Sequence, residues 1–126
     1  VEKKLHTLHM NGREIFKFAV RVMGEAAEEV LSAAGLTKDE LDFFISHQAN
    51  IRIIEAAAKR LGLSSDKVVV NVDRYGNTST ASIPLALNDA LRDGKIKNSD
   101  NIVMVGFGAG LTWGAVALRW YDYKER

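Results

Sequence analysis

Hydrophobic residues recur every three or four positions over two long stretches of the chain, which is the spacing of one face of a helix. The first stretch covers residues 12–34 and ends before Gly35, a natural C-terminal cap. Its apolar positions are Ile15, Phe18, Ala19, Val22, Ala26, Val30 and Leu31. The second stretch covers residues 50–61 and is closed by Gly62. A third helix begins near residues 80–82 and ends before Gly94, because Pro84 is tolerated without a kink only in a first turn.

Short apolar runs lie between and after these helices, as expected for buried strands. They cover residues 41–45, 68–72, 101–105 and 113–120, and residues 1–10 alternate well enough for a further strand. Residues 37–40 have the spacing of a capping box and predict a short turn before the first run. The last two runs are close enough in sequence to be antiparallel neighbours. This order predicts an α/β fold with a mixed sheet and helices on both of its faces.

Composition indicates a soluble globular domain. The 126 residues are 47% hydrophobic, which is enough for one domain with a core. No apolar run approaches the ~20 residues of a membrane span, and we see no leader, so we expect a cytoplasmic protein without a membrane partner. Seventeen basic and sixteen acidic residues leave a net charge of +1, which favours no nucleic acid. The absence of cysteine excludes disulfides, thiolate metal sites and a cysteine nucleophile within this chain.

Polar or glycine-rich segments follow three of the predicted strands, at the ends where α/β sheets bind ligands. They are residues 46–50 (Ser-His-Gln-Ala-Asn), 73–79 (Asp-Arg-Tyr-Gly-Asn-Thr-Ser) and 106–110 (Gly-Phe-Gly-Ala-Gly). Taken alone, His47 could hydrogen-bond its own loop, and Asn77 could be a turn asparagine in a left-handed conformation. The glycine segment is not a dinucleotide-binding loop, because a strand follows it rather than a helix. His6 and His9 have no third ligand at metal spacing, so we expect no metal.

Together, the three segments resemble the signatures of β-ketoacyl-acyl carrier protein synthase III. This family of thiolase-fold condensing enzymes starts type II fatty acid synthesis. The matching motifs are His47-Gln48-Ala49-Asn50, residues 74–79 and residues 106–114, and the resemblance covers residues 5–120. It implies that residues 1–126 form the C-terminal thiolase-like half of an acyltransferase of lipid metabolism, without the N-terminal half that carries the catalytic cysteine. It implies no cofactor, only the substrates acyl-CoA and malonyl-acyl carrier protein.

The resemblance also implies roles for individual residues. His47 and Asn77 match the two donors that stabilise the malonyl thioester oxygen during decarboxylation, and the N–H of Ala109 matches a donor of the oxyanion hole. Positions near the pantetheine arm of the substrate are matched by Asn50, Gly12 and Phe16.

Six basic residues match or extend the surface on which the family docks its acidic carrier protein, and such surfaces mainly speed encounter. They are Arg13, Lys17, Arg21, Arg52, Lys59 and Arg60. The alternative is a solvated face of two helices. The other expected partners are the N-terminal half and a second copy in a homodimer. The third helix is apolar over more than one face, and the halves of the family pack together about an approximate twofold axis.

Two other functions stay open: half of an enzyme similar to a type III polyketide synthase, and a carrier-protein binding module without catalysis. The polyketide enzymes use the same cysteine, histidine and asparagine, but the His-Gln-Ala-Asn tetrad favours the fatty-acid enzyme. A cysteine-bearing α/β half encoded just before Val1 would distinguish an enzyme from a module. We expect the chain alone to be inactive, because it lacks the nucleophile.

Overall fold

The computed structural model describes residues 9–122, so the strand expected over residues 1–10 lies almost wholly outside the described part. The helices and strands follow one another as α1 (Gly12–Ala33), β1 (Phe43–Ser46), α2 (Ile51–Leu61), α3 (Val72–Tyr75), α4 (Ser82–Arg92), β2 (Asn101–Gly108) and β3 (Thr112–Arg119). Short 3-10 turns at Lys38–Glu40, Ser65–Lys67 and Ser79–Ala81 precede β1, α3 and α4.

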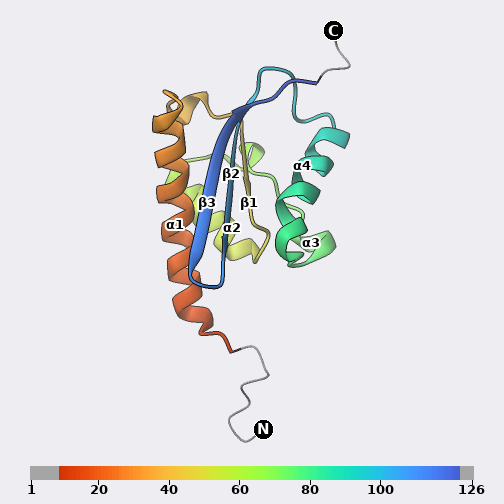
Figure 1. The fold of residues 1–126 in the computed structure, drawn as a ribbon. Helices are drawn as coiled ribbons and strands as arrows, with labels where there is room; N and C mark the ends of the chain where they lie inside the picture. The colour runs from red at the N-terminus through yellow and green to blue at the C-terminus, as the bar shows by residue number, and fades with distance from the viewer. Residues whose placement is uncertain (1–8, 123–126) are drawn as a thin grey trace, which may run out of the picture.

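The three strands of the described chain form a mixed sheet in the order β1-β2-β3. β1 runs parallel to β2, with Ser46 opposite Val105, and β2 runs antiparallel to β3, with Gly108 opposite Thr112. Parallel pairing places the carboxyl ends of β1 and β2 at the same edge of the sheet, where the β2–β3 hairpin also turns (Figure 1). α1 and α2 lie on one side of the sheet and α4 on the other (Figure 1), which confirms the predicted α/β fold.

Alternating side chains of the strands build one core on each face of the sheet. Phe44 and Val103 pack among α1 and α2, whereas Ile45 and Ile102 pack against α4. Successive side chains of a strand point to opposite faces, so a strand covered on both sides is apolar at every position. This explains the continuous apolar runs in the sequence.

The structure confirms Gly62 and the capping box at Thr37, which were expected from the sequence, and shows a further cap at Asn50 that was not expected. Asn50 accepts a hydrogen bond from the N–H of Arg52 at the start of α2, and Gly62 ends that helix in the left-handed conformation with φ +70°. Thr37 and Glu40 form the predicted capping box. The apolar spacing of residues 50–61 predicts Ile51 on the inner face of α2, but this residue is 40% exposed. Within residues 9–122, no helix is both long and apolar enough to cross a membrane.

Residues 68–72 do not form the strand that their apolar run predicts. Val68 makes an isolated parallel bridge with Phe44, and the N–H of Val69 donates to the Phe44 carbonyl (3.0 Å). The chain then turns into α3 at Val72. We attribute this to the side chain of Gln48, which hydrogen-bonds the Val69 carbonyl and the Asn71 N–H. In a longer strand, the backbone of β1 would pair with these two groups.

The glycine segment also differs from its prediction, because β2 continues through Gly108 and leaves only residues 109–111 for the turn. Phe107 lies opposite Trp113 across the hairpin, and pairs of aromatic residues stabilise neighbouring strands. Trp113 also packs edge-on against Phe18 of α1, with ring centroids 5.8 Å apart. These contacts extend the pairing of β2 with β3 beyond residues 101–105, the apolar run that was recognised in the sequence.

Candidate active site

His47 follows the last residue of β1 and is held against β2. Its backbone N–H donates to the Val105 carbonyl (2.8 Å), and its ring packs edge-on against Phe107, with centroids 5.2 Å apart. The side chain is half-buried, and this burial lowers the pKa of His47 below the ordinary value for histidine. The imidazole is therefore uncharged at neutral pH, with one N–H donor and one acceptor nitrogen.

Gln48 joins the His47 segment to the next loop through a fully buried side chain. Its Nε2 donates to the carbonyls of Ser46 (3.0 Å) and Val69 (3.2 Å), and its Oε1 accepts from the N–H of Asn71 (2.9 Å). Three bonds use most of what one amide can offer, so the two segments are held at a set separation.

Asn77 lies in an exposed loop whose backbone needs a glycine before it. Gly76 has φ +67° and ψ −156°, a region that residues with a Cβ avoid. The left-handed residue of this turn is Ser79, at φ +53°, rather than Asn77 as the turn interpretation supposed. The Oδ1 of Asn77 accepts from the N–H of Ser79 (3.1 Å), which leaves its Nδ2 group as a donor for a ligand.

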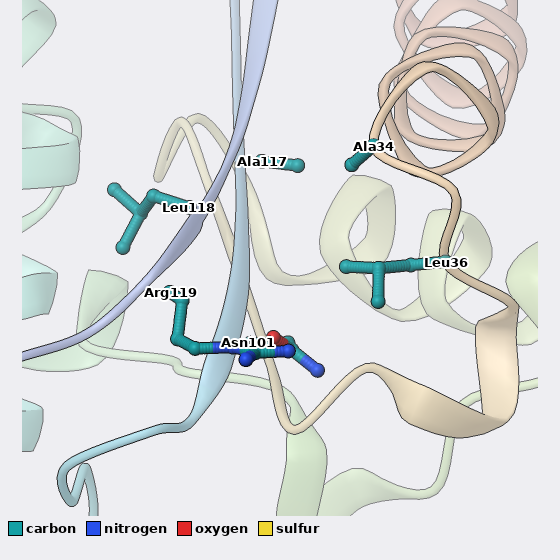
Figure 2. A pocket seen from close by; sticks show the side chains of 6 residues that line it. All are labelled: Ala34, Leu36, Asn101, Ala117, Leu118 and Arg119. Atoms are coloured by element: carbon teal, nitrogen blue, oxygen red, sulfur yellow. Dashed lines mark hydrogen bonds between the residues drawn. The ribbon is translucent and has the colours of Figure 1, made fainter.

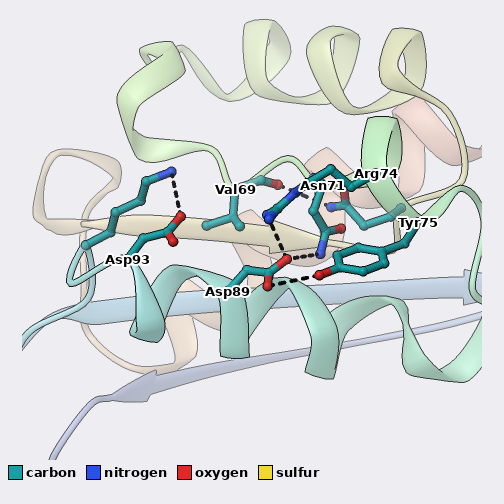
Figure 3. A network of polar contacts seen from close by, with 8 residues as sticks. Val69, Asn71, Arg74, Tyr75, Asp89 and Asp93 are labelled. Carbon is teal, nitrogen blue, oxygen red and sulfur yellow. Dashed lines mark hydrogen bonds and ion pairs between the residues drawn. The ribbon is translucent and has the colours of Figure 1, made fainter.

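Asp89 on α4 accepts hydrogen bonds from three residues that precede Asn77, as Figure 3 shows. Its Oδ2 accepts from Asn71 Nδ2 (2.9 Å) and Arg74 Nη2 (2.8 Å), and its Oδ1 accepts from Tyr75 Oη (3.4 Å). The Asp89 side chain is 4% exposed. The hydrogen bond from Asn71 and the charge of Arg74 lower the pKa of Asp89, so it stays ionised. Sequence reasoning missed this cluster, although an acidic residue between the buried Ala86 and Ala90 was a signal for it.

The structure brings three of the predicted segments to one edge of the sheet (Figure 1). His47 contacts the end of β2, and α4 begins there soon after Asn77. A methyl group added to Gly106 would lie 3.6 Å from Cδ1 of Ile83 in the first turn of α4. Ala109 lies in the exposed hairpin turn, and its carbonyl accepts from Oγ1 of Thr112 (3.1 Å).

The three residues predicted near the pantetheine arm lie at the starts of two helices. Gly12 is the first residue of α1, and Phe16, 37% exposed, follows one turn later. Asn50 caps α2 through its Oδ1, which is 2.8 Å from the N–H of Arg52. Asn50 therefore has a structural role, and the substrate role of all three residues stays a prediction.

The six candidate docking cations lie on α1 and α2, and acidic neighbours pair three of them. Glu25 lies 3.0 Å from Arg21 and 3.5 Å from Arg60, and Glu14 lies 3.6 Å from Lys17. Arg60 crosses α1 where Gly24 leaves room, since a Cβ at Gly24 would lie 2.7 Å from its Cδ. Of these six cations, Arg13, Arg52 and Lys59 form no ion pair within residues 9–122.

A pocket of about 210 Å³ lies at the opposite end of the sheet, where α1 ends and β2 begins (Figure 2). It is lined by Ala34, Leu36, Asn101, Ala117, Leu118 and Arg119. Two of its polar groups bond each other, with Arg119 Nε 3.2 Å from Asn101 Oδ1. Among residues 9–122, no three histidine, cysteine, aspartate or glutamate side chains are grouped closely enough to hold a metal ion.

Comparison with known proteins agrees with this geometry. Residues 31–120 match the family model of the 3-oxoacyl-[acyl-carrier-protein (ACP)] synthase III C terminal region. Over 120 residues, the chain is 61% identical to a β-ketoacyl-[acyl-carrier-protein] synthase III of Symbiobacterium thermophilum, covering 95% of this chain and 36% of that protein. A protein of the same name from Staphylococcus aureus strain Newman is 58% identical over 120 residues, covering 95% and 38%.

A crystal structure of β-ketoacyl-[acyl carrier protein] synthase III from Thermus thermophilus superposes with a TM-score of 0.88 at 59% identity, covering 90% of this chain and 35% of that one. This neighbour confirms the thiolase-like fold. The chain spans about a third of the length of the relatives it matches. The family model covers more than half of the chain, and the chain therefore belongs to the 3-oxoacyl-[acyl-carrier-protein] synthase III family, of which it matches the C-terminal domain.

Proposed function

We propose that residues 1–126 are the C-terminal domain of a β-ketoacyl-acyl carrier protein synthase III, and that His47 and Asn77 assist decarboxylation of malonyl-acyl carrier protein. Family membership supports the class of enzyme. The observation that carries the proposed roles is the place of His47 at the carboxyl end of β1, where it contacts Val105 and Phe107 on β2 and where burial lowers the pKa of its imidazole.

The proposed reaction has two halves. A cysteine thiolate attacks the acyl-CoA thioester, the carbon–sulfur bond to CoA breaks and CoA leaves as its thiolate. This chain has no cysteine, so the thiolate comes from the remainder of the enzyme. The malonyl thioester then loses carbon dioxide, and the electron pair of the broken bond forms an enolate. The enolate carbon attacks the acyl-cysteine, a carbon–carbon bond forms and the cysteine thiolate is released.

His47 and Asn77 act on the enolate oxygen of the second half. The imidazole N–H and the Nδ2 group of Asn77 are two donors aimed at the oxygen where charge develops, and each such donor contributes about 10²–10³ in rate. An uncharged imidazole is a far weaker acid than an imidazolium. It therefore stabilises the enolate without protonating the carbon that must attack. The backbone N–H of Ala109 is the third proposed donor and serves the oxyanion hole.

The proposed partners are an acidic acyl carrier protein, the N-terminal half of the enzyme and a second copy in a homodimer, all in the cytoplasm. Arg13, Arg52 and Lys59 support the first, because no ion pair within residues 9–122 neutralises them. Trp113 and Val116, 56% and 45% exposed, support a protein contact at β3. Light scattering of the chain at micromolar concentration measures self-association, and a folded monomer would contradict it.

The test of the proposed roles uses a full-length enzyme in which this chain replaces the matching 120 residues of the Symbiobacterium thermophilum relative. His47→Ala and Asn77→Ala each lower the rate of malonyl decarboxylation by about 10²–10³ and leave acylation of the cysteine nearly unchanged. His9→Ala, a histidine outside the site, is the control and leaves both steps at the parent rate. Equal loss of both steps in a folded His47→Ala enzyme would contradict the assignment.

A further inference from the structure

Two loops carry the proposed donors, and a chain of hydrogen bonds joins them. Its first links, through Gln48 and Asn71, are buried, and its last, from Arg74 and Tyr75 to Asp89, are partly buried. Gln48, next to His47, accepts from the backbone of Asn71. The side chain of Asn71 donates to Asp89, a residue 3% exposed on α4. The segment that carries His47 is thus connected through the protein interior to Asp89 on α4.

Asp89 also holds the residues directly before Asn77. Arg74 and Tyr75, the last two residues of α3, both donate to its carboxylate (Figure 3). Arg74 lies over the Tyr75 ring as well, 5.4 Å from its centroid. Only Gly76 separates Tyr75 from Asn77, so the position of the anchored turn determines the position of the Asn77 backbone.

We propose that Asp89 is a positioning residue that holds the Asn77 loop in register with His47, acting through Asn71, Arg74 and Tyr75. This inference rests on the proposed function of His47 and Asn77. Asp89 touches no substrate in this scheme, and its contribution is the relative placement of two donors on one oxygen. Misplacing a catalytic group by about 1 Å can cost about 10²-fold in rate. A surface loop such as 76–79 has few contacts of its own to prevent that shift.

The carboxylate suits this task better than a neutral side chain would. Three donors converge on two oxygens, two of them at 2.8–2.9 Å and Tyr75 at 3.4 Å, and a carboxylate accepts all three as charge-assisted hydrogen bonds, which are the stronger ones. An asparagine of the same shape replaces one acceptor oxygen by a donor, which would face either Tyr75 or the Asn71 and Arg74 pair. The change therefore releases the α3 turn without removing volume from the core.

The experiment compares Asp89→Asn with Asp93→Asn in the same full-length chimera. Asp93 is the C-cap residue of α4, one turn after Asp89, and forms a longer pair with Lys95 (3.9 Å), so it is the matched control. Asp89→Asn lowers malonyl decarboxylation at least tenfold and changes cysteine acylation by less than twofold. Asp93→Asn changes neither step. Equal decarboxylation rates for the two variants, or an equal loss of both steps in Asp89→Asn, overturn the proposal.

A double substitution separates positioning from a general loss of structure. If Asp89 acts through Asn77, then adding Asp89→Asn to Asn77→Ala lowers decarboxylation by less than twofold further, because the donor that Asp89 positions is already gone. If the two losses multiply instead, Asp89 acts by another route and the inference is wrong.

Failure of the proposed function has its own signature, in which the parent chimera decarboxylates no better than Asn77→Ala. The positioning claim is then decided by amide NMR spectra of the 126-residue chain. Asp89→Asn shifts resonances in both residues 47–50 and 71–79 and speeds hydrogen exchange at Asn71, and Asp93→Asn does not. If Asp89→Asn shifts only resonances of α4, Asp89 does not hold the two loops together and the positioning claim is wrong, whether or not the enzyme assignment is right.

Discussion

Replacing Gln48 by leucine tests whether its amide completes the sheet edge. The change introduces an apolar side chain of similar size but removes the Gln48 partners of three backbone groups, the carbonyls of Ser46 and Val69 and the N–H of Asn71. The three residues are buried, at 0%, 5% and 2% exposure. Each orphaned group costs about 1–3 kcal/mol. Burying the leucine recovers about 1.5–3 kcal/mol. We therefore expect a net loss of about 4 kcal/mol in the free energy of unfolding.

Urea unfolding of the chain measures this loss as a lower midpoint with an unchanged slope. Asn88→Leu is the control, because Asn88 is exposed on α4 and surface changes usually stay within about 0.5 kcal/mol. A Gln48→Leu midpoint equal to that of the parent would refute the reasoning, since it would mean that the backbone groups bonded by Gln48 find other partners.

Gln48→Glu tests the same hydrogen bonds through the pH dependence of the free energy of unfolding. At neutral pH a carboxylate oxygen would face the Ser46 and Val69 carbonyls that Nε2 now binds. Burial among acceptors raises the folded-state pKa of the introduced carboxyl above its unfolded value. Its protonated form can donate, so the deficit against the parent is smallest below the ordinary glutamate pKa and grows as pH rises through the raised value. A deficit that shrinks with rising pH would contradict this.

Three further predictions concern the site and its surroundings. Because the folded-state pKa of Asp89 is lowered, its contribution to stability is present above the ordinary aspartate value of about 3.9 and is lost as pH falls through the folded value. Urea midpoints between pH 3 and 7 should therefore fall less steeply with acid in Asp89→Asn. Gly76→Ala lowers the free energy of unfolding, measured in urea, by about 1–3 kcal/mol, because residues with a Cβ avoid the φ and ψ of Gly76. Gly114→Ala is the control and lowers it little, because a Cβ added there has open space around it. In the chimera, Arg52→Glu raises the KM for malonyl-acyl carrier protein more than that for malonyl-CoA at low salt, and Lys97→Glu, outside the two helices, affects neither.

Local sequence determined the helices, their caps and the residues at the strand ends. A helix is specified by apolar spacing and by capping residues a few positions apart, so Asn50, Gly62 and the Thr37 capping box could all be recognised without a structure. His47 was recognised in the same way, because it directly follows a buried run. The resemblance of three short motifs then indicated the family, and the family model agrees.

Tertiary structure alone decided how those pieces meet. The run at 68–72 has every local feature of a strand, but the side chain of Gln48 takes the backbone groups that a strand would use, and no local pattern reveals a partner 21 residues away. The same holds for Asp89, whose bonds reach back 15 and 18 residues to Arg74 and Asn71. Glu25 pairs Arg60 across two helices, so the number of free cations could not be counted from the sequence. Long-range polar contacts depend on the packing of whole elements, and packing is what local sequence leaves undetermined.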